Sequence, residues 1–138
     1  MDVSGTDTLQ GKEFSFTLDG VKLHSIVAVA PFAYLTPGDE AEMPWLTMSK
    51  RVEDNPLTVF NAWLRETLAK RIPAERPRKT FVVTAVNDGV PVRRWTFAGV
   101  WIASVVQGGI LTTSHELALE EVALGYDSVA CEVLGSDS

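Results

Sequence analysis

The chain has 138 residues, a length that suits one domain with a single hydrophobic core. Apolar residues make up 46% of the sequence and charged residues 22%, a balance typical of a folded globular protein and unlike that of a disordered chain. The formal net charge of -6 argues against nucleic-acid binding, because that function depends on basic surface.

Cysteine content and hydropathy indicate the cellular compartment in which the protein is expected. Cys131 is the only cysteine, so neither an internal disulfide nor a cysteine-based metal site is expected, as suits a reducing cytosol. No apolar run approaches the roughly 18 residues that a membrane helix needs. Residues 1–5 lack the basic start and apolar block of a secretory signal. We expect a cytoplasmic protein unless a larger machine carries it out of the cell.

The first predicted element is a β-hairpin. Apolar and polar side chains alternate over residues 13–18, and Asp19-Gly20 then supplies a two-residue turn. Such a turn has positive φ angles that suit the twist of paired strands. It places Phe16 opposite Leu23, so the apolar pattern and the turn agree on the register.

The next segment mixes strand and loop signals. Residues 26–30 are apolar enough to extend the second strand of the hairpin, whereas residues 31–42 contain the prolines and glycine of a loop. Strand character returns over residues 45–52.

One helix is predicted after these strands. Asp54 or Asn55 can cap it, Pro56 suits the first helical position, and the run continues to about Ala69 before later prolines stop it. The expected apolar stripe consists of Leu57, Phe60, Leu64 and Leu68, with Val59 and Trp63 beside it.

Further strands follow the helix. Residues 79–87 are rich in β-branched side chains, and Asp88-Gly89 turns the chain into a long strand over residues 92–106, which Gly108 ends.

The last segment is ambiguous by propensity, because its glutamate, leucine and alanine favour a helix. Its alternation favours a strand in which the apolar parity shifts at Glu120-Glu121, between Leu119 and Val122, as at a β-bulge. We predict a strand.

Together these elements predict a mainly β protein of the α+β class, an antiparallel β-barrel-like sandwich with one flanking α-helix. We expect a flexible N-terminal lead at residues 1–12, a single β-barrel domain at residues 13–134 and a C-terminal tail at residues 135–138.

No residue grouping points to catalysis, a cofactor or a metal. His24 and His115 lie in different segments without metal-ligand spacing, and the sequence lacks a phosphate-binding glycine loop and a nucleophile elbow. The densest carboxylate group consists of Glu116, Glu120, Glu121 and Asp127. Paired carboxylates can perform acid–base chemistry, but we expect strand-face charges that pair with Arg93, Arg94 or a neighbouring subunit. We therefore assign no catalytic, cofactor-binding or metal-binding residue.

The order of the motifs resembles a known family. Residues 46–52 are similar to a family strand that ends in lysine and arginine, and they precede an acidic turn and a helix whose central tryptophan Trp63 matches. Residues 88–101 resemble the central hairpin, and residues 117–127 resemble the closing strand with its embedded glutamate. In this order, over roughly residues 12–130, they resemble the tail tube protein family of contractile phages and contractile injection systems. That family is related to the hemolysin-coregulated tube protein of type VI secretion.

The resemblance implies a structural subunit without catalytic chemistry. Six copies would join sheet edge to sheet edge in a ring, and rings would stack into a hollow tube inside a sheath. The implied partners are further copies, the sheath protein and baseplate components, in a tail-like particle assembled in the cytoplasm or in a virion tail. Free strand edges suit this role. We expect the edges at residues 82–86 and 117–122, where a proline would block assembly.

Two alternatives to a tube body remain open. Residues 30–42 are shorter than the glycine-rich excursion that helps rings to stack in typical members, so the chain can instead be a specialised initiator or terminator ring. A different class is a free-standing small β-barrel that binds an apolar ligand. Its wall would be formed by the tryptophans, which we otherwise expect mainly in the core: Trp45, Trp63, Trp95 and Trp101. The mass of the protein in solution separates these readings.

Overall fold

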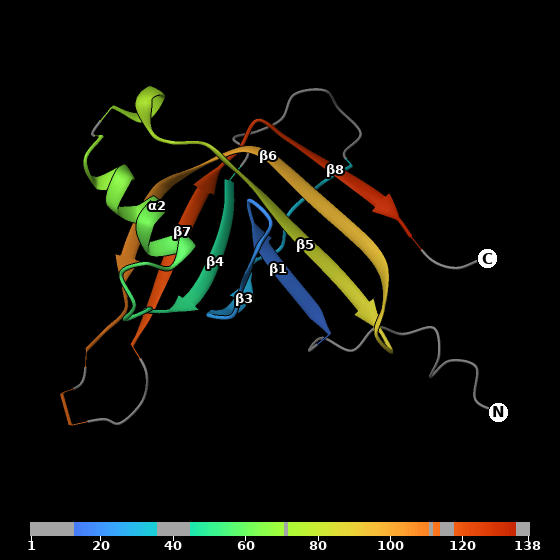
Figure 1. Cartoon of the computed structure of the whole chain (residues 1–138), viewed down its shortest axis with the longest axis horizontal. Coiled ribbons are helices and arrows are strands. Elements are labelled where there is room, and N and C mark those ends of the chain that lie inside the picture. The colour runs from blue at the N-terminus through green and yellow to red at the C-terminus, as the bar shows by residue number, and fades with distance from the viewer. Residues whose placement is uncertain (1–12, 36–44, 71, 111, 114–117, 135–138) are drawn as a thin grey trace.

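The computed structural model describes residues 13–35, 45–70, 72–110, 112–113 and 118–134. Its elements in chain order are β1 (Phe14–Leu18), β2 (Val21–Leu23), β3 (Ile26–Val29), β4 (Trp45–Arg51), α2 (Val59–Leu68), the 3-10 turn η1 (Pro73–Glu75), β5 (Lys79–Asn87), β6 (Val90–Gln107), β7 (Leu119–Gly125) and β8 (Ser128–Val133) (Figure 1). The predicted mainly β fold with a flanking α-helix is confirmed. The expected lead and tail lie outside the described residues.

The strands form one antiparallel sheet that folds over into two layers. Their order is β2-β1-β5-β6-β7-β4-β3. The remaining strand, β8, lies outside this order and pairs with β6. The first half of β6 pairs with β5 and β8, whereas residues 101–107 pair with β7. The sheet does not close, because β2 and β3 at its two ends pair with one strand each. The fold is therefore an open sandwich rather than a closed barrel.

The long strand β6 bends where it passes between the layers, and Figure 1 shows it arching over the other strands. Gly99 lies at the bend with a φ of 65°, between the last pairing with β8 at Ala98 and the first with β7 at Trp101. A side chain there would collide with the carboxylate of Asp127, whose backbone N–H donates to Ala98. Glycine suits both the positive φ and the close approach.

Both predicted hairpins form with the predicted turns. Asp19 and Asp88 have φ angles of 49° and 53°, and the glycine after each also has a positive φ, as a type I′ turn requires. Phe16 lies opposite Leu23, which confirms the predicted register of the first hairpin.

The helix α2 begins later than predicted. Thr58 is its N-cap, because Thr58 Oγ1 accepts a hydrogen bond from the backbone N–H of Asn61 at 3.2 Å. The prediction of Asp54 or Asn55 as the cap is wrong. Asn55 instead stabilises the turn before the helix, where its side-chain oxygen accepts from the N–H of Leu57 at 2.9 Å. Within the described part of the chain, no helix is long and apolar enough to cross a membrane.

The predicted apolar stripe of α2 is only partly correct. Phe60, Trp63 and Thr67 are buried, whereas Leu57 is 83% exposed and Leu68 is 72% exposed. Leu57 precedes the N-cap Thr58 and so lies outside the helix, and Leu68 is the last helical residue. The predicted stripe therefore fails at its two ends, because periodicity alone does not fix where a helix begins and ends.

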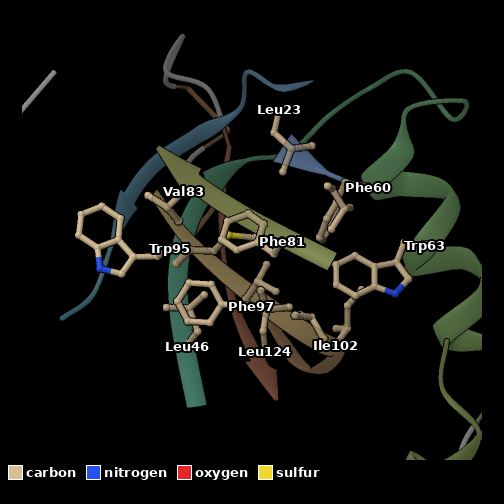
Figure 2. Packing of buried hydrophobic residues seen from close by; sticks show 14 of the residues in the cluster. Leu23, Leu46, Phe60, Trp63, Phe81, Val83, Trp95, Phe97, Ile102 and Leu124 are labelled. Carbon is tan, nitrogen blue, oxygen red and sulfur yellow. The ribbon is translucent and has the colours of Figure 1, made fainter. Parts of the chain in front are cut away.

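The core lies between the two layers and extends under α2 (Figure 2). Phe81 and Phe97 occupy its centre with ring centroids 6.1 Å apart, and both are fully buried. Phe60 and Trp63 reach it from the helix, and Trp95 lies at the opposite margin (Figure 2). This core holds the layers at fixed positions and so sets where the free edges of the sheet lie.

Strand β7 does not contain the predicted parity shift. Glu120, Val122 and Leu124 all point inward in one unbroken alternation, and the register with β4 is regular along the whole strand. The irregularity lies in β6 at residues 102–104. The inward position of Glu120 explains the error, because a buried glutamate was read as an outward one.

Two strands differ from expectation. β3 does not extend the hairpin strand β2, because it crosses to the other layer and pairs with β4. β8 was not predicted as a separate strand; it returns after Tyr126-Asp127 to pair with β6.

Candidate assembly surfaces

The free strand edges are the first candidate surface. Among the described residues, β2, β3 and β8 each pair on one side only. Both strands predicted as edges are internal: β5 lies between β1 and β6, and β7 lies between β4 and β6. The edge prediction at residues 82–86 and 118–122 is therefore wrong, and Leu117 lies outside the described residues. A proline in β5 or β7 would break a ladder inside the fold.

A buried ion pair joins β4 to β7. Lys50 is 0% exposed, and its Nζ lies 2.8 Å from Oε2 of Glu120, directly opposite in the register. The same Nζ donates to the backbone carbonyl of Arg51 at 2.9 Å and lies 3.5 Å from the Glu53 carboxylate. It also lies 4.1 Å from the ring centroid of Phe60 on α2. Lys50 thus connects β4, β7 and the helix through one buried charge.

Glu53 extends this ionic cluster to the chain before β3. Ser25 Oγ donates to Oε2 of Glu53 at 2.5 Å. Burial by itself would raise the pKa of Glu53, but hydrogen bonds from Ser25 and Thr58 and the charge of Lys50 outweigh it, so the pKa lies below its ordinary value of 4.5. Glu53 is therefore a carboxylate at neutral pH.

The described members of the predicted acidic group differ in burial, since Glu120 is buried whereas Glu121 and Asp127 are exposed. For Glu120 the predicted pairing with Arg93 or Arg94 is wrong, because Glu120 pairs with Lys50 and Arg94 lies 3.2 Å from Glu132. Pairing of the other acidic residues with a neighbouring subunit stays a prediction. The cross-strand register between β4 and β7 is what brings Lys50 and Glu120 together, although they are 70 residues apart in the chain.

Of the two histidines, the structure describes only His24. His24 is exposed, and its backbone carbonyl accepts from Nη2 of Arg51 at 2.8 Å. It borders a depression of about 490 Å³ between β2 and the start of α2. His115 and Glu116 lie outside the described residues. Among those that the structure describes, no three His, Cys, Asp or Glu side chains gather closely enough to hold a metal ion.

Two of the four tryptophans lie outside the core. Trp45 is 41% exposed and meets half-buried Trp101 edge to face, with ring centroids 5.9 Å apart. The guanidinium carbons of Arg76 and Arg78 lie 5.9 and 5.2 Å from the centroid of Trp101. A Cβ on Gly125 would lie 2.5 Å from the Trp101 indole, so the ring rests directly on the β7 backbone. We call these four side chains the tryptophan–arginine cluster; only Trp63 and Trp95 are core residues as expected.

Arg76 also secures the end of β6. Its Nη1 donates to the backbone carbonyls of Ile102 and Ala103 at 2.9 and 3.0 Å. β5 pairs with β6 only as far as Val100, so the guanidinium takes up carbonyl groups beyond the end of that ladder. A side chain therefore covers a sheet edge that another strand does not reach.

An apolar groove opens between the two layers on the side where the sheet fails to close. It has a volume of about 610 Å³ and is lined by residues 26–32 on one side and by Phe14, Phe16, Val83 and Trp95 on the other. Every lining residue is apolar. We call it the β1–β3 groove. The sequence predicted none of these surfaces individually, because each depends on strand order.

Comparison with known proteins identifies the family. The family model of the T4-like virus tail tube protein gp19 matches residues 32–130, which is 99 of the 138 residues. Comparison with curated protein sequences gave no significant match.

Three solved structures illustrate the shared fold. A chain in the sheath/tube terminator of PVC, an extracellular contractile injection system, is 15% identical with a TM-score of 0.72, over 91% of this chain and 97% of that one. A chain in the PVC sheath-tube complex is 14% identical with a TM-score of 0.71, over 97% and 99%. Hcp1 from Flavobacterium johnsoniae is 10% identical with a TM-score of 0.58, over 91% and 98%.

The TM-scores show a common fold, and the family match covers well over half of the sequence. The predicted resemblance to the tail tube family is thereby confirmed. The chain belongs to the T4-like virus tail tube protein family.

Proposed function

We propose that this chain is the structural subunit of the inner tube of a phage tail or contractile injection system. Six copies join into a ring, and rings stack into a hollow conduit inside a sheath. The observation that carries the proposal is the match of residues 32–130 to the tail tube family. The proposal assigns no catalytic residue, because the function consists of ring closure, stacking and passage.

The free edges of the sheet support assembly by strand pairing. Within the described residues, a lone subunit leaves β2, β3 and β8 each with one unpaired side, a state that favours contact with another chain. A closed ring of identical subunits pairs one free edge of each chain with a complementary edge of its neighbour and leaves no open end to propagate further. The buried Lys50–Glu120 pair supports the same role, because it fixes β4 against β7 behind the edge strand β3.

The proposed partners outside the ring are a sheath protein and baseplate components. Solved structures with the same fold include chains of a PVC sheath-tube complex and of an anti-feeding prophage baseplate. By this analogy the chain is assembled in the cytoplasm into a tail-like particle.

A terminator or initiator ring is the second candidate. A chain in the PVC sheath/tube terminator and one in the anti-feeding prophage cap have TM-scores of 0.72 and 0.69 with this fold, similar to the 0.71 for the tube complex. The short segment at residues 30–42 also favours it, since less chain is available there to reach a second ring. The two candidates differ in whether rings stack.

Light scattering over a concentration series tests the proposal. A single ring has an expected mass of 6 × 15.1 kDa, or 90.6 kDa. A terminator stops at that mass, whereas a tube subunit continues to larger multiples of it. A chain that keeps a mass of 15.1 kDa at every concentration would contradict both candidates and favour the free-standing ligand-binding barrel.

A further inference from the structure

We infer that the β1–β3 groove receives an extended apolar segment from a second copy of this chain. The inference rests on the proposed assembly and states where the subunits interlock. In this account the subunit alone has an incomplete core, and a neighbouring copy completes it.

The groove is a continuation of the core rather than a surface dimple. Phe16, Val83 and Trp95 form one cross-strand row on β1, β5 and β6, because Phe16 pairs with Val83 and Val83 pairs with Trp95. Figure 2 shows Val83 and Trp95 at the margin of the packed cluster. Residues 26–31 line the other side of the groove, which has a volume of about 610 Å³, and Phe32 ends it by packing edge to face against Trp95 with ring centroids 5.8 Å apart. Only apolar side chains border that space, so water gains few hydrogen bonds in it.

The indole of Trp95 points to a peptide as the occupant. Trp95 is 8% exposed, and its Nε1–H is buried without an acceptor among the described residues. Buried donors in folded proteins are nearly always paired, because an unpaired one loses its hydration without compensation. A backbone carbonyl of an inserted segment supplies the acceptor that the described part of the subunit lacks.

The strands beside the groove also favour an extended segment. Of the strands that the structure describes, β3 pairs only with β4. β2 covers β1 from Phe16 onward, so none of the described strands lies beside Phe14 and Ser15 on that side. Backbone groups are therefore available on both flanks of the apolar space. An added strand uses such groups for hydrogen bonds and places alternate side chains in the groove. A small apolar molecule would fill the volume but leave the backbone groups unpaired.

A second copy is the occupant that the assembly supplies at high local concentration. The chain belongs to a family named for a tube, and its own sheet ends in unpaired edges. Val27 on β3 lines the groove and is 52% exposed, an apolar rim that burial against a neighbour would cover.

A matched pair of charge substitutions tests whether the β1–β3 groove is the site at which two subunits make contact. Val27→Lys places a charge on the groove, and Leu68→Lys places it on α2, away from the groove and the free strand edges, at a position with 72% exposure. Both positions tolerate lysine in the isolated fold because they face solvent. We expect Val27→Lys to raise the concentration for half-assembly at least about tenfold and Leu68→Lys to change it less than about threefold. Equal effects of the two variants, or wild-type assembly by Val27→Lys, would overturn the inference.

Trp95→Phe tests the hydrogen bond, and a purely structural role predicts the opposite result. Removing a donor that is unpaired in the lone subunit should leave urea unfolding of the dissociated chain unchanged or slightly improved. The same change should weaken assembly about five- to tenfold, because the inserted carbonyl loses its donor. A variant that unfolds more easily as a monomer but assembles normally contradicts the inference.

Cross-linking identifies the occupant directly. A photo-reactive amino acid at position 27 is used in a mixture of ¹⁴N- and ¹⁵N-labelled chains. Cross-links of mixed isotope composition support a second copy. Cross-links within one chain only, or a small molecule retained in native mass spectra of the ring, overturn the inference while the proposed tube function stands. A chain that never associates overturns both.

Discussion

Replacing Lys50 with methionine should destabilise the fold by about 3–5 kcal/mol, because it leaves buried carboxylates without a counter-charge. Methionine has a similar length but no charge, so the loss is mainly electrostatic. Glu120 would lose its contact at 2.8 Å, and Glu53 would lose the ammonium group at 3.5 Å. This is a large fraction of the roughly 5–15 kcal/mol by which proteins of this size are stable.

The two carboxylates make different contributions, and a double-mutant cycle separates them. Glu120→Leu should cost about 3 kcal/mol, the low end of the range for breaking a buried pair, since the Glu53 carboxylate at 3.5 Å still balances part of the Lys50 charge. The double substitution Lys50→Met/Glu120→Leu replaces the pair by apolar side chains and should lie within about 2 kcal/mol of the natural chain. The singles would then sum to more than the double, a coupling that only interacting residues show.

Urea unfolding followed by circular dichroism measures these differences. The slope of the unfolding free energy against urea should stay constant while the midpoint falls, and the melting temperature of Lys50→Met should drop by about 10–20 °C. Lys79→Met is the matched control, because Lys79 pairs with Asp19 at 3.5 Å on the surface and should lose less than about 1 kcal/mol. If Lys50→Met costs no more than Lys79→Met, the buried pair is not what holds β4 to β7.

Further substitutions test local contacts, each by the same unfolding measurement. Gly125→Ala should cost about 1–3 kcal/mol because its Cβ would overlap the Trp101 indole, whereas Gly109→Ala meets nothing within 4 Å and serves as the control. Thr58→Ala removes the N-cap of α2 and should cost about 1 kcal/mol; an unchanged midpoint would exclude the cap. The lowered pKa of Glu53 means that its carboxylate stabilises the fold fully above pH 4.5, and that this contribution is lost as the pH falls from 4.5 through the lower native pKa. Glu53→Gln should therefore flatten the acid limb of the stability profile, and an identical acid limb would refute this assignment.

The sequence predicted the local features well because their signals are local. The Asp19-Gly20 and Asp88-Gly89 turns bring their strands into register through φ angles that depend on two residues each. The long strand β6 was clear from its β-branched and aromatic residues. β8 escaped prediction, because six residues directly after a turn carry too little alternation to stand apart from β7.

Features that depend on distant residues were missed or misread. Glu120 was assigned to the surface because an isolated glutamate is rarely buried, and only the register with β4 reveals that Lys50 lies opposite. The buried side of α2 required knowledge of how the helix meets the sheet, since Leu68 is apolar yet exposed.

The prediction of which strands lie at the sheet edges was wrong for a related reason. Alternation identifies a strand but not its neighbours, so β5 and β7 were taken as edges although each has a partner on both sides. The open β1–β3 groove follows from the same strand order and was equally hidden. The family resemblance nevertheless survived these errors, because it rested on the order of motifs rather than on their pairing.

Negative-stain electron microscopy of the purified chain tests the central claim most directly. The account predicts hollow rings with six-fold symmetry, either single or stacked into tubes, with a mass in solution that is a multiple of 90.6 kDa. Fields without ring-shaped particles at every concentration, together with a constant mass of 15.1 kDa, would contradict the claim that this chain builds a tube.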